Sequence, residues 1–189
     1  MSPEFPIIKT DRLLFRQFEY TDLENVFKGL SHPDVIKYYG VSYPTLEATQ
    51  EQMIFFSDLE KNETGIWWAV CSLDNKTFYG AGGLNSLSKE HRKAEIGFWL
   101  LPEFWVKGIM TEAMPKICEY GFVTLGLHRI EGFVETENKN CINTMQKLDF
   151  QLEGTMRECE IKNGKYISFK HLCKIEDKSM TSDYPIQTG

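Results

Sequence analysis

The chain has no long apolar run and no paired cysteines. None of its 189 residues starts an apolar stretch long enough to cross a bilayer, and the opening MSPEFPIIKT lacks the basic-then-apolar pattern of a secretory signal. Its five cysteines are widely spaced and form no C-x-x-C pair, which is typical of reduced thiols. We therefore expect a cytoplasmic protein without membrane association.

Excess positive charge and metal-ligand spacing are also missing. The 21 basic and 27 acidic residues give a formal net charge of -6, which argues against a general nucleic-acid-binding surface. The acidic balance suits a cationic substrate, but it equally suits a surface that only keeps the protein in solution. The four histidines do not cluster with each other or with the cysteines, so we expect no metal site.

The most informative stretch that is present spans residues 94–113, AEIGFWLLPEFWVKGIMTEA. A strand-like apolar run stops at a proline, and a helix begins after a turn that contains Gly108. The first N–H groups of a helix lack intrahelical acceptors and carry the positive end of the helix dipole, so they attract an anion. The pattern predicts a phosphate-binding turn, and an ordinary strand-to-helix connection is the alternative. Neither a P-loop nor a G-x-G-x-x-G pattern occurs there, and no nucleophile elbow is present.

The length fits one domain, and turn signals divide it into alternating elements. Apolar periodicity predicts helices after Thr21, at 34–39, over 47–61, after Gly108 and over 138–148, with Pro115 bending the fourth of these or delaying its start. We expect strands at 12–18, 66–73, 78–84, 94–101, 128–135, 153–161 and 167–175, the last two joined by an Asn163-Gly164 hairpin turn.

The run LLPEFWVKGIMTEA resembles the acetyl-CoA-binding signature R/Q-x-x-G-x-G/A of the GNAT superfamily of N-acetyltransferases. Together with TDRLLFRQF, it is most similar to the ribosomal-protein N-terminal (Rim-type) branch. Trp105 stands at the Arg/Gln position, Gly108 at the invariant glycine and Met110 at the final Gly/Ala, whereas Val106 departs from the usual glycine.

The resemblance covers about residues 8–176 and implies an α+β (mixed α/β) fold. Its features are a mostly antiparallel sheet of seven strands, splayed in the middle, with about four helices. A single domain would occupy residues 1–176, followed by a polar tail over 177–189. Family members often pair through sheet edges, so a homodimer is among the expected assemblies.

The resemblance also implies acetyl-CoA as a cosubstrate and assigns residues to it. Backbone N–H groups of the turn would hold the pyrophosphate, backbone groups at the end of the preceding strand would hold the pantetheine amides, and an asparagine side chain would contact the pantetheine arm. The expected coenzyme-binding residues are Trp99, Leu100, Leu101, Trp105, Val106, Lys107, Gly108, Ile109, Met110, Thr111 and Asn138.

Two residues are candidates for the chemistry. An amine must lose its proton before it attacks an acetyl thioester, and a carboxylate can assist. Glu95 resembles the strand glutamate that acts as a base in part of the family; an exposed glutamate at a strand end is the alternative. The resemblance implies that Cys141 lies near the coenzyme sulfur, where it would be either a proton donor to the leaving thiolate or a small packing residue. Glu103 is a weaker candidate base.

The resemblance implies that the acceptor is a primary amine, first of all the α-amino group of a protein. A small amine, such as a polyamine or an aminoglycoside, is the alternative within this class. A third hypothesis is an acyl-CoA-binding sensor without catalysis. It is motivated by Val106, by Asp149 in place of a family glycine, and by Met145 where some members carry a catalytic tyrosine.

Overall fold

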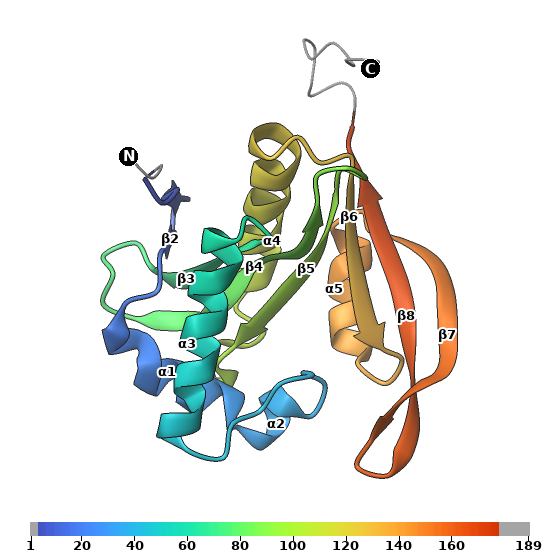
Figure 1. Ribbon diagram of the computed structural model, residues 1–189, viewed down its shortest axis with the longest axis horizontal. Coiled ribbons are helices and arrows are strands. Elements are labelled where there is room, and N and C mark those ends of the chain that lie inside the picture. The colour runs from blue at the N-terminus through green and yellow to red at the C-terminus, as the bar shows by residue number, and fades with distance from the viewer. Residues whose placement is uncertain (1–3, 178–189) are drawn as a thin grey trace.

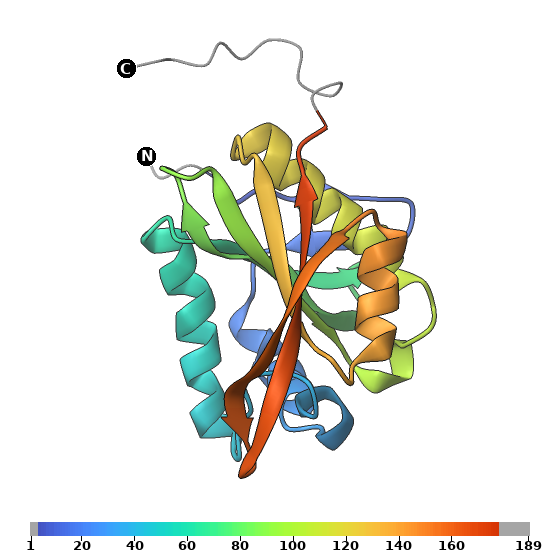
Figure 2. The same ribbon diagram turned by 90° about the vertical axis from the view of Figure 1, so that its right-hand side faces the viewer.

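The computed structural model describes residues 4–177, and helices cover both faces of its single sheet (Figure 1). Apart from Asp177, the tail expected over 177–189 lies outside the described residues. Helices α1 (Leu23–Leu30), α2 (Pro33–Ile36) and α3 (Leu46–Lys61) lie on one side, and α4 (Ile109–Glu119) and α5 (Lys139–Lys147) lie on the other. Figure 2 shows this layering with α3 and α5 on opposite sides of the strands.

The sheet is mixed, and its strands follow the order β1-β2-β3-β4-β5-β6-β8-β7. Their bounds are β1 (Ile8–Lys9), β2 (Leu13–Arg16), β3 (Ile66–Ser72), β4 (Phe78–Ser88), β5 (Lys93–Leu100), β6 (Arg129–Glu135), β7 (Gln151–Lys162) and β8 (Lys165–Ile175). The expected fold class is confirmed, but two counts change. Within residues 4–177 there are eight strands rather than seven, because β1 adds a two-residue edge. There are five α-helices in the same range, the number that the periodicity predicts, rather than the about four that the resemblance implies.

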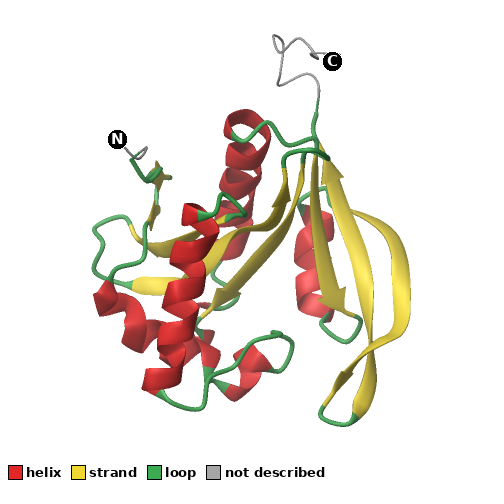
Figure 3. Cartoon of the chain, viewed as in Figure 1, coloured by secondary structure: helices red, strands yellow, loops and turns green. Residues whose placement is uncertain are grey.

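Strands β5 and β6 form the one parallel pair of the described sheet, and they separate after a short contact. Their register runs from Lys93↔Arg129 to Glu95↔Glu131, and no later residue of β5 pairs with β6. The two strands then diverge, as Figure 3 shows in yellow. This separation is the predicted splay, and it leaves one edge of β5 without a neighbouring strand.

Alternation along β5 builds two separate cores, as predicted from the pattern of residues 95–100. Ile96 and Leu100 pack in the cluster that also holds residues of α4 and α5, whereas Trp99 belongs to the cluster formed with α1 and α3. The segment is therefore fixed from both faces, which gives the edge that faces the gap a rigid support.

Helix α4 begins directly after Gly108 and continues through Pro115, so the delayed start considered for this helix does not occur. A π-helical turn, Tyr120–Thr124, follows it, and short 3-10 turns occupy Tyr20–Asp22 and Pro102–Phe104. The predicted Asn-Gly hairpin is confirmed, since Asn163 and Gly164 have φ values of 51° and 74° between β7 and β8. None of the helices within residues 4–177 has both the length and the apolar character needed to cross a membrane.

Candidate active site

The turn before α4 and the first residues of α4 carry a row of backbone amides that bond to no protein group. The Trp105 amide donates to the Pro102 carbonyl at 3.1 Å, and the Glu112 amide donates to the Gly108 carbonyl at 3.1 Å. Between them, the six amides of residues 106–111 have no acceptor in the described part of the chain. Successive free N–H groups at a helix start, with left-handed residues among them, form a concave site for an anion.

Val106 adopts the left-handed conformation that a family glycine would adopt easily. Its φ is 54° and its side chain is fully exposed, so no packing compensates for the strain. A β-branched residue at positive φ is an outlier, with a cost on the order of 1–2 kcal/mol. Gly108, with φ of 74°, adopts the same left-handed conformation without that cost, because it has no Cβ. The departure at position 106 therefore strains the turn.

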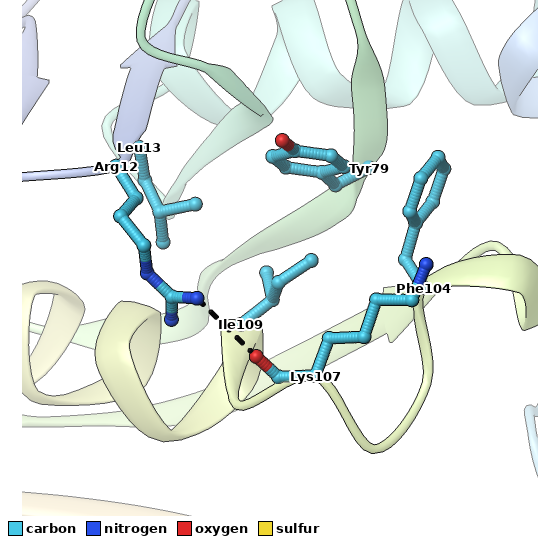
Figure 4. Close-up of a pocket in the computed structure, with 6 residues that line it drawn as sticks. All are labelled: Arg12, Leu13, Tyr79, Phe104, Lys107 and Ile109. Carbon is cyan, nitrogen blue, oxygen red and sulfur yellow. Dashed lines mark hydrogen bonds between the residues drawn. The ribbon is translucent and has the colours of Figure 1, made fainter.

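Three contacts hold this turn against the rest of the fold. The Trp105 indole N–H donates to the Leu100 carbonyl at 3.0 Å, and Arg12 Nη1 donates to the Lys107 carbonyl at 3.4 Å. Lys107 Nζ lies 5.3 Å from the centroid of the Phe104 ring. Arg12, Phe104 and Lys107 line a pocket of about 180 Å³ together with Tyr79 and Ile109. Figure 4 shows these five side chains around it. Two cations, Arg12 and Lys107, thus flank the amides.

The backbone of β5 directs the N–H and C=O groups of alternate residues into the gap between β5 and β6, which opens where the two strands separate. The Leu101 amide donates to the Tyr79 carbonyl of β4 at 2.9 Å, so Trp99 and Leu101 direct their backbone groups toward β4. Phe98 and Leu100 then face the opposite side, where β6 has diverged. Of the three strand residues expected to bind pantetheine, Leu100 alone faces the gap with its backbone, and Phe98, which sequence reasoning missed, joins it.

Asn138 lies across the gap, where α5 begins. Its Oδ1 accepts the backbone N–H of Cys141 at 3.2 Å, so the side chain caps the helix. Its Nδ2 donates to no acceptor among residues 4–177 and keeps both hydrogens for a ligand. One side chain therefore combines a structural bond with a free donor.

Cys141 is half-buried in the first turn of α5, and burial raises the pKa of its thiol to about 12. An ordinary thiol has a pKa of about 8.5, so a proton transfer from Cys141 to such a thiolate would run uphill by roughly 4–5 kcal/mol. The environment thus opposes the proton-donor hypothesis and favours the packing alternative.

Glu95 lies half-buried at the point where β5 and β6 separate. Burial raises the pKa of its carboxyl, the neighbouring charge of Glu131 raises it further, and a hydrogen bond with Asn85 acts in the opposite direction. Tyr39 is near enough that the charge of Glu95 contributes to raising the pKa of its phenol, after burial and Tyr43. A carboxylate with a raised pKa is a stronger base than an exposed one.

The other carboxylates of this face are neutralised. On β6, Glu131 accepts hydrogen bonds from Arg129 Nε at 2.7 Å and from Lys93 Nζ at 3.1 Å. Glu135 accepts one from Lys162 Nζ at 2.6 Å, which also binds the carbonyl of residue 37. Among these three acidic residues, Glu95 is the one for which the described structure records no ion pair.

The weaker candidate base lies elsewhere. Glu103 forms an ion pair with Lys28 on the protein surface, and this contact lowers the pKa of its carboxyl. Exposed pairs of this kind contribute little to stability. The structure therefore favours the interpretation of Glu103 as a surface residue.

Comparison with known proteins gives a consistent result. Residues 12–151 match the family described as "Acetyltransferase (GNAT) domain". The uncharacterized N-acetyltransferase YoaA of Bacillus subtilis (strain 168) is 37% identical over 161 residues, which span 85% of this chain and 91% of that protein.

Two solved structures share the fold at low sequence identity. The ribosomal L7/L12 α-N-protein acetyltransferase RimL, in complex with coenzyme A, has a TM-score of 0.81 at 18% identity and covers 90% of this chain and 98% of its own. The spermidine N-acetyltransferase of Vibrio cholerae, in complex with CoA and spermine, has a TM-score of 0.80 at 21% identity and covers 91% and 100%.

Proposed function

Because the chain belongs to the GNAT acetyltransferase family and is an N-acetyltransferase, we propose that it moves the acetyl group of acetyl-CoA to the α-amino group of a peptide or protein. The observation that carries this proposal is the combination of six free amides at the start of α4, residues 106–111, with the carboxylate of Glu95, which has no recorded ion pair, where β5 and β6 separate.

The residues on both sides of the gap fit acetyl-CoA, which supplies the acetyl thioester when bound. The amides of residues 106–111 would hold its diphosphate, with Lys107 adding positive charge. The backbone N–H and C=O of Phe98, the N–H of Leu100 and the Nδ2 of Asn138 would bind the amides of the pantetheine arm, whereas the Leu100 carbonyl already accepts the Trp105 indole N–H. Each donor is present and has no protein acceptor in the described residues.

Glu95 would take the proton from the attacking amine. At pH 7 an α-amine with pKa of about 7.7–8.0 loses its proton at a cost of roughly 1–1.4 kcal/mol, whereas a lysine with pKa of about 10.4 costs roughly 4.6 kcal/mol. The raised pKa of Glu95 makes this carboxylate a stronger base toward either amine. The lower cost of deprotonation favours an α-amine as the acceptor.

The charges of Glu95, Glu131 and Glu135 support the same choice. Arg129 and Lys93 neutralise Glu131, and Lys162 neutralises Glu135, so Glu95 is the one of these three carboxylates without a recorded ion pair. One such charge suits an acceptor with one ammonium group. A polyamine carries several positive charges along its length, and free carboxylates at matching intervals would be needed to bind it.

An acceptor panel tests the proposal. Peptides with free and with acetyl-blocked N-termini, spermidine and an aminoglycoside are each incubated with acetyl-CoA, and thiol release and product mass are measured. We expect turnover with the free peptides and none with the blocked ones. A higher kcat/KM for spermidine or the aminoglycoside would contradict the α-amine assignment. Coenzyme binding without turnover of any acceptor would instead favour the sensor hypothesis.

We also propose that residues 1–176 make up a single catalytic domain. A chain that ends at Glu176 is expected to keep the melting temperature and coenzyme affinity of the full chain. A loss of either would contradict this boundary.

A further inference from the structure

An acidic residue lies in the first turn of α4, next to the free amides. Glu112 is four positions after Gly108, and its side chain is only 23% exposed. Its pKa is lowered, because hydrogen bonds from Thr10 and Arg12 outweigh the effect of burial, so it is ionised at neutral pH. A bare carboxylate in this position would repel an anionic ligand from the amides.

Two residues of the turn between β1 and β2 bind this carboxylate. Thr10 Oγ1 donates to Glu112 Oε1 at 2.5 Å, and Arg12 Nε donates to Oε2 at 2.7 Å. Arg12 Nη2 lies 2.6 Å from the same Oε2, which makes a charge-assisted fork. Both carboxylate oxygens are therefore engaged by a segment that is about a hundred residues away in sequence.

The same turn is itself rigidly built. The Thr10 hydroxyl accepts the Leu13 amide at 2.9 Å and the Arg12 amide at 3.3 Å while it donates to Glu112. The Thr10 amide donates to the Leu13 carbonyl at 3.0 Å. Arg12 also reaches the phosphate turn itself, since its Nη1 donates to the Lys107 carbonyl, as the dashed line in Figure 4 shows.

We propose that Thr10 and Arg12 are positioning residues for the coenzyme diphosphate, which act by neutralising Glu112. This inference rests on the proposed binding of acetyl-CoA to the amides of residues 106–111. The rival explanation is a direct contact between Arg12 and a phosphate, since the Arg12 side chain is 56% exposed. The two explanations differ in what happens when Glu112 loses its charge.

Titration calorimetry with coenzyme A, on the full chain, separates them. Arg12→Gln should weaken binding about tenfold, because Glu112 is left as an uncompensated charge beside the anion. The double variant Arg12→Gln/Glu112→Gln should recover an affinity within about threefold of wild type. The matched control is Lys28→Gln, which breaks a similarly exposed ion pair, with Glu103, and should leave the affinity unchanged.

Salt dependence gives a readout that a merely structural role would not change. The penalty of Arg12→Gln should shrink as ionic strength rises from about 0.05 M to about 0.5 M, since it arises from charge repulsion. If Arg12→Gln does not fold, Thr10→Val tests the same inference, because it removes the hydroxyl that donates to Glu112. For this variant we expect about threefold weaker binding that Glu112→Gln restores.

The outcomes are distinguishable. A double variant as weak as Arg12→Gln would overturn the inference in favour of a direct phosphate contact. Equal affinity of wild type and Arg12→Gln would overturn it while leaving the proposed function intact. A wild-type chain that does not bind coenzyme A would overturn the proposed function together with the inference.

Discussion

Glu95 and Glu131 face each other at the last register position of the parallel pair, immediately before β5 and β6 separate. Glu131 has two cationic partners and Glu95 has none within the described residues, so the charge of one glutamate acts on the pKa of the other. The place where the sheet opens is therefore also the place where a carboxyl is held in a more basic state.

Glu95→Gln should lower kcat by roughly 10²–10⁴-fold, the usual contribution of a positioned general base, and should leave coenzyme affinity unchanged. Because Glu95 acts as a base only when ionised, wild-type kcat/KM should rise with pH through its raised pKa, and the variant should lose this limb. Glu103→Gln, in the surface ion pair, is the control. An unchanged pH profile in Glu95→Gln would remove this residue from the mechanism.

The same substitution should stabilise the fold at neutral pH. The pKa of Glu95 is higher in the folded than in the unfolded chain, so the folded state holds this proton more tightly. The free energy of unfolding should therefore fall as pH rises from the ordinary to the raised pKa and stay lower above it. In Glu95→Gln the free energy of unfolding should not show this fall. Urea unfolding of both proteins at pH 4 and pH 7 would measure the difference. A variant less stable than wild type at pH 7 would contradict the desolvation argument.

Val106→Gly should relieve the strain in the phosphate turn. Removing a β-branched side chain from positive φ gains about 1–2 kcal/mol, and the greater freedom of glycine in the unfolded chain returns about 0.5–1 kcal/mol. We expect a net gain in stability of about 0–1.5 kcal/mol. Val123→Gly, at an exposed valine in the π-helical turn, should destabilise by about 0.5–1 kcal/mol. If both variants destabilise equally, the turn is not strained at Val106.

The parts of the fold that depend on local pattern could be predicted from sequence, and the parts that depend on register could not. Alternation over residues 95–100 predicted the two faces of β5, and Gly108 predicted the start of α4. Which alternate residues face the gap depends on which edge of β5 pairs with β4. That relationship is set by a distant strand, and for this reason Phe98 was missed.

The environment of Glu95 could not be predicted for a related reason. Asn85, Glu131 and Tyr39 come from three separate segments, and only the sheet register and the packing of the loop after α2 bring their charges and dipoles to Glu95. The contact between Arg12 and Glu112 likewise joins segments about a hundred residues apart. No local spacing in the sequence signals either arrangement.

Cys141→Ala should keep most of the activity. Burial raises the pKa of this thiol to about 12, which makes it a poor proton donor to a thiolate with an ordinary pKa of about 8.5. We expect kcat within about threefold of wild type and a small loss of stability from the missing sulfur. Steady-state kinetics across pH 6–9 would measure this, and a fall of kcat by 10² or more would restore Cys141 as the general acid.

Asn138 has two separable roles, because its Oδ1 caps α5 while its Nδ2 is free. Serine caps helices about as well as asparagine but has no amide hydrogens, so Asn138→Ser should keep the free energy of unfolding within about 0.5 kcal/mol. It should also weaken coenzyme A binding roughly three- to tenfold, as the loss of one neutral hydrogen bond implies.

Asn138→Ala should lose about 1 kcal/mol of stability as well as affinity. Wild-type affinity in Asn138→Ser would show that the side chain serves the helix alone, and the measurement therefore isolates the ligand bond from the cap.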